Sequence, residues 1–328
     1  MTRSKIAWTD RTWNPVSGCS PVSAGCANCY AARYAARRLP KGGFADREFS
    51  ELRCHPERLG APLRWRKPAR VFVDSMSDLF HESVPFEFIA AVFGVMAHCP
   101  QHTFQVLTKR PARMREFFAE LWRRAERSAS VFPFDSPEWR AIHVCRAAAI
   151  RETTGFTSDA RQREEWPLPN VWLGVSVEEQ RTAAERIPDL MLTPAAVRFV
   201  SAEPLIGPVD LTLCCGAWLD WVIVGGESGP GARPCNVEWI RAAVEQCRKA
   251  AVPVFVKQLG AYVLDRNDAG FSGGDCDAWN VDDAKVIDED HECHQGAPVR
   301  VRLSDAKGGD MAEWPEDLRV RQFPEAAR

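Results

Sequence analysis

Short apolar runs that are rich in β-branched residues recur along the chain, and each is followed by a polar cluster and usually by a stretch with helical spacing. Continuous apolar runs are typical of strands that are buried on both faces, as in a parallel sheet. The intervening stretches repeat apolar residues every three and four positions, which indicates amphipathic helices. The runs are "ARVFVDSMSDLFH", "HTFQVLTKRP", "NVWLGVSVEEQ", "VRFVSAEPLIGP", "LDWVIVGGESGPG" and "VPVFVKQLG".

This alternation predicts an α/β fold, a partial or complete parallel βα barrel of the TIM type with about six to seven strands. The segment "KIAWTDRTWNP" supplies an extra strand near the N-terminus. We assign residues 1–261 to the barrel, with an insertion near 128–168 that contains several prolines and a short helix. From Tyr262 onward the sequence is rich in Gly and Asp with little periodicity, so we treat residues 262–328 as a C-terminal extension.

Polar and charged residues stand directly after nearly every predicted strand. In a parallel barrel these positions share one rim, the carboxyl-terminal face on which βα-barrel active sites are built. We therefore expect an active site on this rim, although each of the charged residues could instead be a salt-bridge partner that closes the strand ends. The candidates are Ser75, Asp78, Lys109, Ser176, Glu178, Ser201, Glu203, Glu227 and Lys257.

Composition narrows the class of protein without identifying it. The chain has 328 residues, 45% hydrophobic and 26% charged, with a net charge of −2. It has neither a signal-peptide core nor an apolar run long enough to span a bilayer, so we expect a cytoplasmic protein without membrane contact. Residues 1–70 carry 14 Lys and Arg against 5 Asp and Glu, whereas residues 265–328 carry 8 against 16. The basic end could attract nucleic acid or phosphate-bearing ligands, or it could be a solvated surface opposite an acidic tail.

Three cysteines, Cys19, Cys26 and Cys29, gather within the segment "NPVSGCSPVSAGCANCYAARYAARR" at residues 14–38. In a reducing compartment, clustered cysteines are more often metal ligands or reactive thiols than a disulfide framework. Gly18 and Gly25 stand directly before two of the three, which gives the loop conformational freedom.

Four interpretations compete for these cysteines. A structural zinc site uses four ligands, but the segment holds one CxxC pair, one further cysteine and no histidine before His55. A thioredoxin-like CxxC pair of Cys26 and Cys29 leaves Cys19 without a role. A third interpretation is that the three cysteines are clustered by chance and have no common function. A 4Fe-4S cluster held by three thiolates leaves one iron open for a small molecule. We favour the cluster, with zinc as the main competitor.

Several motifs occur together and in a specific order: "TWNPVSGCSPVSAGCANCYA", "DSMSDLFH", "LTKRP", "LGVSVE", "SAEPL", "GGESG", "KQLG" and "GGDMAEWPEDLRVRQFP". With this set, the chain resembles the phage-associated three-cysteine-motif family, a domain of unknown function that is regarded as radical-SAM-like. The resemblance extends over most of the chain. The first cysteine gap holds six residues, whereas the wider superfamily has CxxxCxxC, and "DSMSD" stands where that superfamily has "GGE".

The resemblance implies an enzyme in which Cys19, Cys26 and Cys29 hold a 4Fe-4S cluster whose open iron binds S-adenosylmethionine. Cleavage of this cofactor would start hydrogen abstraction from a substrate, and an electron-donor protein would supply the electron. The implied cofactor-binding residues are Tyr30, Ser75, Asp78, Ser176, Glu178 and Ser201. The implied catalytic residues are Lys109, Glu203, Glu227 and Lys257, with Lys109 and Arg110 suited to a carboxylate or phosphate.

The substrate stays open, and a nucleotide or nucleic-acid base is one hypothesis. The aromatic residues Trp8, Trp13, Tyr30 and Tyr34 could stack on bases or simply pack around the loop. A different class of function is a non-catalytic zinc or iron–sulfur protein of phage origin that serves as a partner module. In the extension, a second metal site or an acidic surface loop could account for Cys276, His291, Cys293 and His294.

Overall fold

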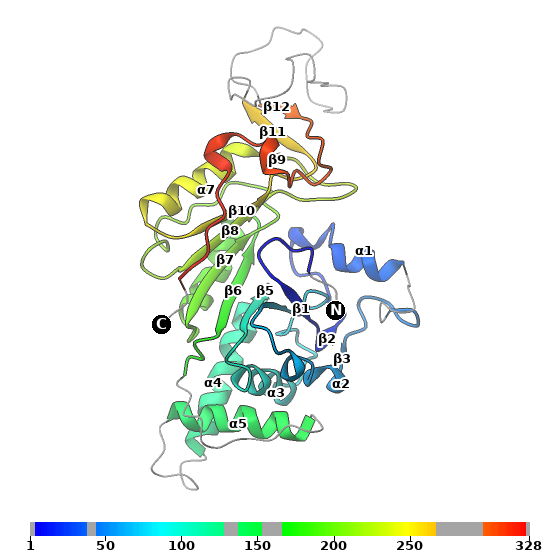
Figure 1. Cartoon of the computed structure of the whole chain (residues 1–328), viewed down its shortest axis with the longest axis vertical. Helices are drawn as coiled ribbons and strands as arrows, with labels where there is room; N and C mark the ends of the chain where they lie inside the picture. Colours follow the sequence, from blue (N-terminus) through cyan, green and yellow to red (C-terminus); the bar gives the residue numbers. More distant parts are fainter. Residues whose placement is uncertain (1–3, 38–43, 128–136, 153–165, 267–297, 326–328) are drawn as a thin grey trace. The chain divides into compact units, whose positions relative to one another are not determined.

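The main sheet has seven strands in the order β1-β4-β5-β6-β7-β8-β10, so that β1 and β10 form its edges (Figure 1). The computed structural model describes residues 4–37, 44–127, 137–152, 166–266 and 298–325. The sheet is all-parallel and curls as a half-barrel flanked by helices, which confirms the predicted α/β class and the predicted strand number. The strands are β1 Arg11–Trp13, β4 Arg70–Val73, β5 Thr103–Thr108, β6 Val171–Val177, β7 Val197–Ala202, β8 Trp221–Gly225 and β10 Val254–Gln258.

Strands β6 and β8 are buried along their whole length, as their continuous apolar sequences predict. Every residue of β6 is buried, and so is every residue of β8. Gly174 of β6 makes room for a neighbour, because a Cβ atom built there would lie 2.5 Å from the Phe199 ring of β7. Parallel strands covered by helices on both faces need this two-sided apolar pattern.

The helices differ in how many of their faces are buried. They are α1 Tyr30–Ala36, α2 Pro56–Leu59, α3 Phe86–Ala97, α4 Pro111–Arg127, α5 Pro137–Glu152, α6 Gln180–Met191 and α7 Val237–Lys249. The 3₁₀ helices are η1 Ala24–Cys26, η3 Pro62–Arg64, η6 Met311–Glu313 and η7 Glu316–Leu318. Helix α4 buries one stripe that includes Met114, Phe117 and Leu121, whereas α3 is buried continuously from Phe88 to Ala97.

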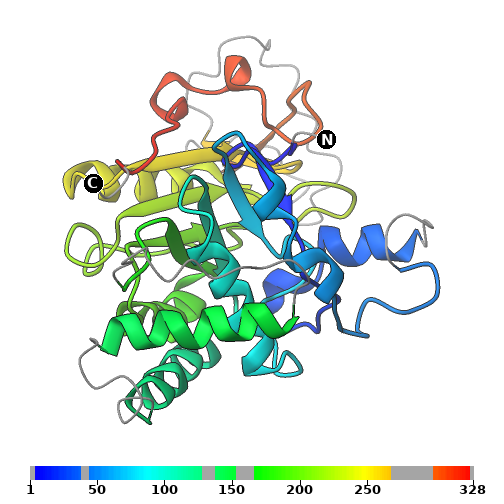
Figure 2. The ribbon, with the colours of Figure 1, turned by 60° about the horizontal axis from the view of Figure 1, so that its bottom comes forward.

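The continuous burial of α3 is explained by α5, which lies across α3 and α4 (Figure 2). Gly94 of α3 allows this close approach, because a Cβ atom built there would lie 2.3 Å from the backbone oxygen of Cys145. Ala141, Cys145 and Ala148 of α5 are buried. The segment predicted as an insertion therefore contributes a helix to the core.

Two small sheets accompany the main one. Strand β2 Val16–Ser17 pairs antiparallel with β3 Arg53–Cys54. Strand β11 Val263–Arg266 pairs antiparallel with β12 Pro298–Val301 and parallel with β9 Cys235–Asn236. Within the predicted C-terminal extension, residues 266 and 298 thus meet across β11 and β12, while Cys276, His291, Cys293 and His294 lie outside the described residues.

The end of the chain covers the open edge of β10. The Val256 amide donates to the Val320 carbonyl (2.9 Å), and the Gln322 amide donates to the Val254 carbonyl (2.9 Å). Trp314 is buried, and its indole nitrogen donates to the Gly308 carbonyl (3.0 Å). An edge strand presents unpaired backbone groups, and this segment satisfies them.

The chain forms two compact units. One comprises Met1–Ser176, Ala184–Val200 and Glu325–Arg328, and the other comprises Val177–Ala183 and Ser201–Pro324. The second unit includes residues on both sides of position 261. The predicted domain boundary between the barrel and the C-terminal extension at this position stays a prediction. Among the described residues, no helix combines the length and the apolar character that crossing a membrane requires.

Candidate functional site

Residues 18–29 of the first unit contain Cys19, Cys26 and Cys29, and we call this segment the cysteine loop. It starts beside the loop that follows β4. The Gly18 amide donates to the Met76 carbonyl (3.0 Å), and Gly18 forms a parallel bridge with Ser77. Gly18 has φ +94°, and a Cβ atom there would lie 2.6 Å from the Glu51 carbonyl oxygen. Only glycine meets both conditions without strain, so Gly18 sets the position of Cys19.

The three cysteines occupy different local structures. Cys19 follows Gly18, Cys26 ends η1, and Cys29 is the N-cap residue of α1, which begins at Tyr30. All three are free thiols of intermediate exposure. Within the described residues, no three Cys, His, Asp or Glu side chains form a group that could hold a metal ion. Metal ligation by Cys19, Cys26 and Cys29 therefore stays a prediction.

The guanidinium of Arg110, the residue directly before α4, contacts the first of these cysteines. One Nη atom donates to Cys19 Sγ (3.6 Å) and to Asp78 Oδ2 (3.4 Å). The other Nη atom donates to the Ser20 carbonyl (3.0 Å) and to Ser20 Oγ (2.9 Å). The Nε atom donates to the Glu82 carboxylate at 3.0 and 3.1 Å. The Arg110 side chain is only 5% exposed, so a buried cation lies against the start of the cysteine loop.

Asp78 is the acceptor that organises this region. Its Oδ1 accepts from the Phe80 amide (3.0 Å) and from Thr108 Oγ1 (2.7 Å). Its Oδ2 accepts from the Lys109 amide (3.0 Å) as well as from Arg110. These bonds occupy both oxygens, so the predicted role of Asp78 in binding a cofactor would require one of them to be exchanged.

Two further predicted residues lie at the cysteine loop. The Tyr30 hydroxyl donates to the Ser75 carbonyl, and Ser75 Oγ donates to Asn14 Oδ1 (3.0 Å). The structure thus brings Tyr30, Ser75, Asp78 and Lys109 together beside the cysteines. Ser176, which also belongs to the first unit, is buried on β6, where its carbonyl accepts from Arg186 (2.7 Å).

Two acidic side chains of this unit, Cys19 and Asp74, have raised pKa values because they are withdrawn from water. Burial raises the pKa of the Cys19 thiol to about 11, and the Asp78 carboxylate adds to this effect, while Arg110 opposes it. Metal binding at Cys19 would therefore release a proton. Asp74 is buried with φ +58°, and burial raises the pKa of its carboxyl well above the ordinary value. Its Oδ1 accepts from the Val16 amide (2.9 Å), which ties the loop after β4 to the strand before the cysteines.

The aromatic residues of the N-terminal region divide into two groups. Trp8 and Trp13 are buried, which favours packing over stacking on a ligand. Tyr30 and Tyr34 are exposed and lie one turn apart on α1, so their side chains share a face of the helix.

In the second unit, one predicted pair forms at the strand ends. The Lys257 ammonium donates to Glu203 Oε1, and the Gln258 amide nitrogen lies 3.4 Å from the same oxygen. The Gln258 side chain also donates to the Gly226 carbonyl (3.0 Å). The ends of β7, β8 and β10 are therefore joined by side chains that follow their apolar runs, as the salt-bridge alternative describes, while a catalytic role of Glu203 and Lys257 stays a prediction.

Glu227 is engaged within its own loop. Its Oε2 accepts from the Arg233 amide (2.9 Å) and from Arg233 Nε (3.0 Å), and its Oε1 accepts from Arg233 Nη (2.7 Å). Glu178 is completely buried, and its backbone accepts from the Ile206 amide (2.9 Å). Ser201 is buried as well. The salt-bridge alternative describes Glu227 in this structure better than a substrate contact does.

Sequence reasoning overlooked Ser20 and His81, and it did not predict that Arg110 contacts the cysteine loop. Ser20 Oγ lies 2.8 Å from His81 Nε2, and both belong to the set around Arg110. The motifs "GCSP", "DLFHES" and "LTKRP" contain Ser20, His81 and Arg110, but nothing local shows that the three segments meet. The sequence shows the three motifs separately, and their contact is a tertiary property.

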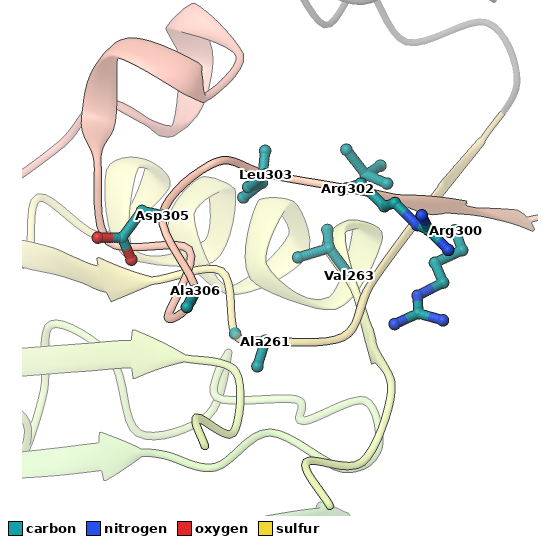
Figure 3. A pocket seen from close by; sticks show the side chains of 9 residues that line it. Ala261, Val263, Arg300, Arg302, Leu303, Asp305 and Ala306 are labelled. Atoms are coloured by element: carbon teal, nitrogen blue, oxygen red, sulfur yellow. The ribbon is translucent and has the colours of Figure 1, made fainter. Parts of the chain in front are cut away.

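A separate pocket of about 180 Å³ opens between β11, β12 and the loop after them (Figure 3). Val263 and Leu303 line it from two sides, and Arg300, Arg302 and Asp305 lie along it. The Arg300 guanidinium stacks on the Tyr262 ring at 4.3 Å from its centroid. Ligand pockets usually measure roughly 300 Å³ or more, and this one combines charges of both signs, so we assign it no ligand.

Comparison with known protein families matches residues 3–310 to the family described as "Protein of unknown function (DUF5131)". The match covers nearly the whole chain, and the chain therefore belongs to this family. No curated protein and no solved structure matches it. Membership of a family of unknown function is thus confirmed, while phage association and radical-SAM character stay predictions.

Proposed function

We propose that this member of the DUF5131 family is a radical S-adenosylmethionine-type enzyme with a 4Fe-4S cluster on Cys19, Cys26 and Cys29. The observation that carries the proposal is the position of the cysteine loop. Gly18 is bonded to the loop after β4, and Cys19 contacts Arg110, the second residue after β5. Active sites of βα barrels are built from the segments that follow the strands, and the cysteine loop joins that set in the first unit.

The donor set fits an iron–sulfur cluster better than structural zinc. Three thiols on one short loop can supply three corners of a cubane and leave the fourth iron open. A closed zinc site needs a fourth ligand. Among the described residues, neither the three cysteines by themselves nor the cysteines with a fourth donor form a metal-holding group in this structure. The preference for the cluster therefore depends on the number of thiols in the segment. The loop would have to draw Cys26 and Cys29 toward Cys19 when the cluster is assembled.

When bound, the cluster supplies the electron that cleaves the sulfonium bond of S-adenosylmethionine and so starts hydrogen abstraction from the substrate. The chain's own residues bind and orient the reactants. Lys109 is the cation we assign to the carboxylate of S-adenosylmethionine or to a phosphate, since the donors of the adjacent Arg110 are engaged by protein groups.

The substrate class we propose is a nucleotide or a nucleic-acid base. Tyr30 and Tyr34 on α1 are exposed aromatic rings in a basic part of the chain. Bases stack on such rings, and basic side chains attract phosphate. Binding of a single-stranded oligonucleotide should weaken with rising salt and with Tyr30→Ala or Tyr34→Ala. Binding that is absent, or that does not depend on salt, would remove this substrate class and leave the cluster proposal intact.

The cluster proposal is tested by anaerobic reconstitution with iron and sulfide, followed by reduction and addition of S-adenosylmethionine. We expect a brown protein and formation of 5′-deoxyadenosine. Cys19→Ala, Cys26→Ala and Cys29→Ala should each lose most of the iron. Cys54→Ala is the matched control, because Cys54 is a free, half-buried thiol on β3 of the same unit.

Two outcomes would contradict the proposal in different ways. A colourless protein with one zinc per chain would favour the non-catalytic metal-binding alternative. An intact cluster that produces no 5′-deoxyadenosine would retain the cofactor and remove the radical chemistry.

A further inference from the structure

Arg110 uses all of its hydrogen-bonding capacity on protein groups. A guanidinium has five N–H donors in a planar fork, and those of Arg110 face five acceptors. The acceptors are the Glu82 carboxylate, Asp78 Oδ2, the Ser20 carbonyl, Ser20 Oγ and Cys19 Sγ. One of these acceptors is the sulfur of a predicted cluster ligand, which sets Arg110 apart from a residue that only stabilises the fold.

The contacts of Arg110 tie two other segments, the cysteine loop and the loop after β4, to one rigid group. Ser20 is held twice, through its carbonyl and its hydroxyl, so the residue after Cys19 cannot move without breaking both bonds. Asp78 and Glu82 fix the fork from the loop after β4. Cys19 therefore has a defined position beside the end of β5 before any cofactor is bound. Cys26 and Cys29 lie on η1 and at the start of α1.

The charges around Cys19 oppose one another. Arg110 brings a positive charge to 3.6 Å from the sulfur, while the Asp78 carboxylate acts on the same sulfur with the opposite sign. Glu82 is 65% exposed and is screened by water, whereas Asp78 is only 7% exposed. Without Arg110, a buried carboxylate would face the sulfur alone. Reduction of a cluster adds negative charge, so a neighbouring cation and an N–H donor to sulfur favour the reduced form.

We infer that Arg110 is a positioning residue for the cluster: it holds Cys19 in place and, by offsetting Asp78, raises the reduction potential of the cluster. This inference rests on the proposed function, because it requires that Cys19 be a ligand. It assigns Arg110 a role toward the protein's own sulfur. The earlier hypothesis that Arg110 binds a carboxylate or phosphate is thereby replaced, and the neighbouring Lys109 keeps that role.

The test is a redox titration of the full-length reconstituted protein, monitored by electron paramagnetic resonance, together with iron and sulfide content per chain. Arg110→Gln should shift the midpoint potential to a more negative value. Arg110→Lys, which keeps the charge but not the fork, should recover part of that shift. Asp78→Asn should shift the potential in the opposite direction. Arg115→Gln is the matched control, because Arg115 lies on the same helix and pairs with Asp189 (3.0 Å).

The outcomes separate this inference from the proposed function. If the wild-type protein holds no cluster, the proposed function and the inference both fail. If the wild type holds a cluster and Arg110→Gln has the same potential and iron content as Arg115→Gln, the inference alone is wrong. A cluster that does not cleave S-adenosylmethionine would leave the potential measurement, and therefore the inference, unaffected.

Should Arg110→Gln fail to fold, as judged by circular dichroism, the comparison between wild type, Arg110→Lys and Asp78→Asn still decides the matter. An unchanged potential in both of these variants would contradict the inference. A shift of opposite sign in the two variants would support it.

Discussion

The cysteine loop of the first unit and the strand ends of the second unit both place a cation against a carboxylate, but they connect different things. Arg110 is shared among Asp78, Glu82, Ser20 and Cys19, which belong to separate segments. In the second unit, Arg233 closes on Glu227 within one loop. Because Arg110 is shared among segments, it fixes the position of the Cys19 sulfur relative to Asp78 and Glu82. The Arg233–Glu227 pair lies within one loop and stabilises only that loop.

The largest expected effect comes from removing the shared carboxylate. Asp78→Ala should cost about 3–5 kcal/mol of stability, because it leaves Arg110 buried with one partner fewer and removes the acceptor of Thr108. Glu227→Ala should cost about 1–3 kcal/mol, because Arg233 is 28% exposed and can reach water. Urea denaturation of both variants measures the difference. An equal or larger loss of stability in Glu227→Ala would show that the shared ion pair of Arg110 contributes no more to stability than the local pair of Arg233.

Glycine substitutions should separate backbone strain from function. Gly18 and Gly260 both have positive φ, and an added Cβ atom would meet a backbone oxygen at 2.6 Å and 3.0 Å, respectively. Gly18→Ala and Gly260→Ala should therefore each lose about 1–3 kcal/mol of stability. Only Gly18→Ala should also reduce the iron content after reconstitution, because it displaces Cys19. Normal iron content in Gly18→Ala would mean that the loop does not depend on this anchor.

The two regions should also differ in their response to pH. Asp74 of the first unit has a raised pKa because of burial, so the native state binds more protons than the unfolded chain above pH about 4. Stability from this group is therefore present at low pH and declines as pH rises toward its folded pKa. Asp305 of the second unit has a lowered pKa, because the Gly309 and Lys307 amides donate to it, so its contribution is lost as pH falls.

Asp74→Asn mimics the protonated carboxyl and should flatten the decline in unfolding free energy between about pH 4 and neutral pH. Asp305→Asn should instead reduce the loss of stability on acidification. Unfolding midpoints measured across this pH range test both variants. A pH dependence that is unchanged in Asp74→Asn would mean that another buried group is responsible.

The smallest expected effect on stability concerns the Lys257–Glu203 pair. Lys257→Gln should change stability by about 0–1 kcal/mol, because both side chains are partly exposed and Glu203 keeps Gln258 nearby. Iron content should be unchanged, while formation of 5′-deoxyadenosine in the presence of substrate should fall if Lys257 contacts the substrate. Arg248→Gln, which removes an exposed pair with Glu245, is the matched control. A large loss of stability in Lys257→Gln would assign the pair a structural role instead.

Much of the architecture follows from local pattern. Apolar runs such as "NVWLGVSVEEQ" correspond to buried strands, and β1 Arg11–Trp13 lies within the segment predicted as the extra strand. The role of α5 could not be foreseen, because its sequence gives no indication that it covers α3. That contact depends on Gly94, whose lack of a side chain matters only once the two helices meet.

The candidate site shows the same division between local and long-range information. The spacing of Cys19, Cys26 and Cys29 is visible in the sequence because all three predicted ligands lie in one short segment. The role of Arg110 is not, since its contact with Cys19 spans 91 residues. Likewise, Asp78 and Glu227 both look like rim carboxylates in the sequence, yet the former organises the cysteine region and the latter closes its own loop.

By itself, the sequence determined the alternation of buried strands and helices, the polar residues at the strand ends and the thiols available for a cluster. These properties depend on residue type and on periods of a few residues, so they can be recognised without knowing the fold. The tertiary structure alone decided which charge faces which sulfur. Side-chain partners are chosen among segments that the strand order brings together, and the strength of a buried ion pair depends on that arrangement rather than on distance along the chain.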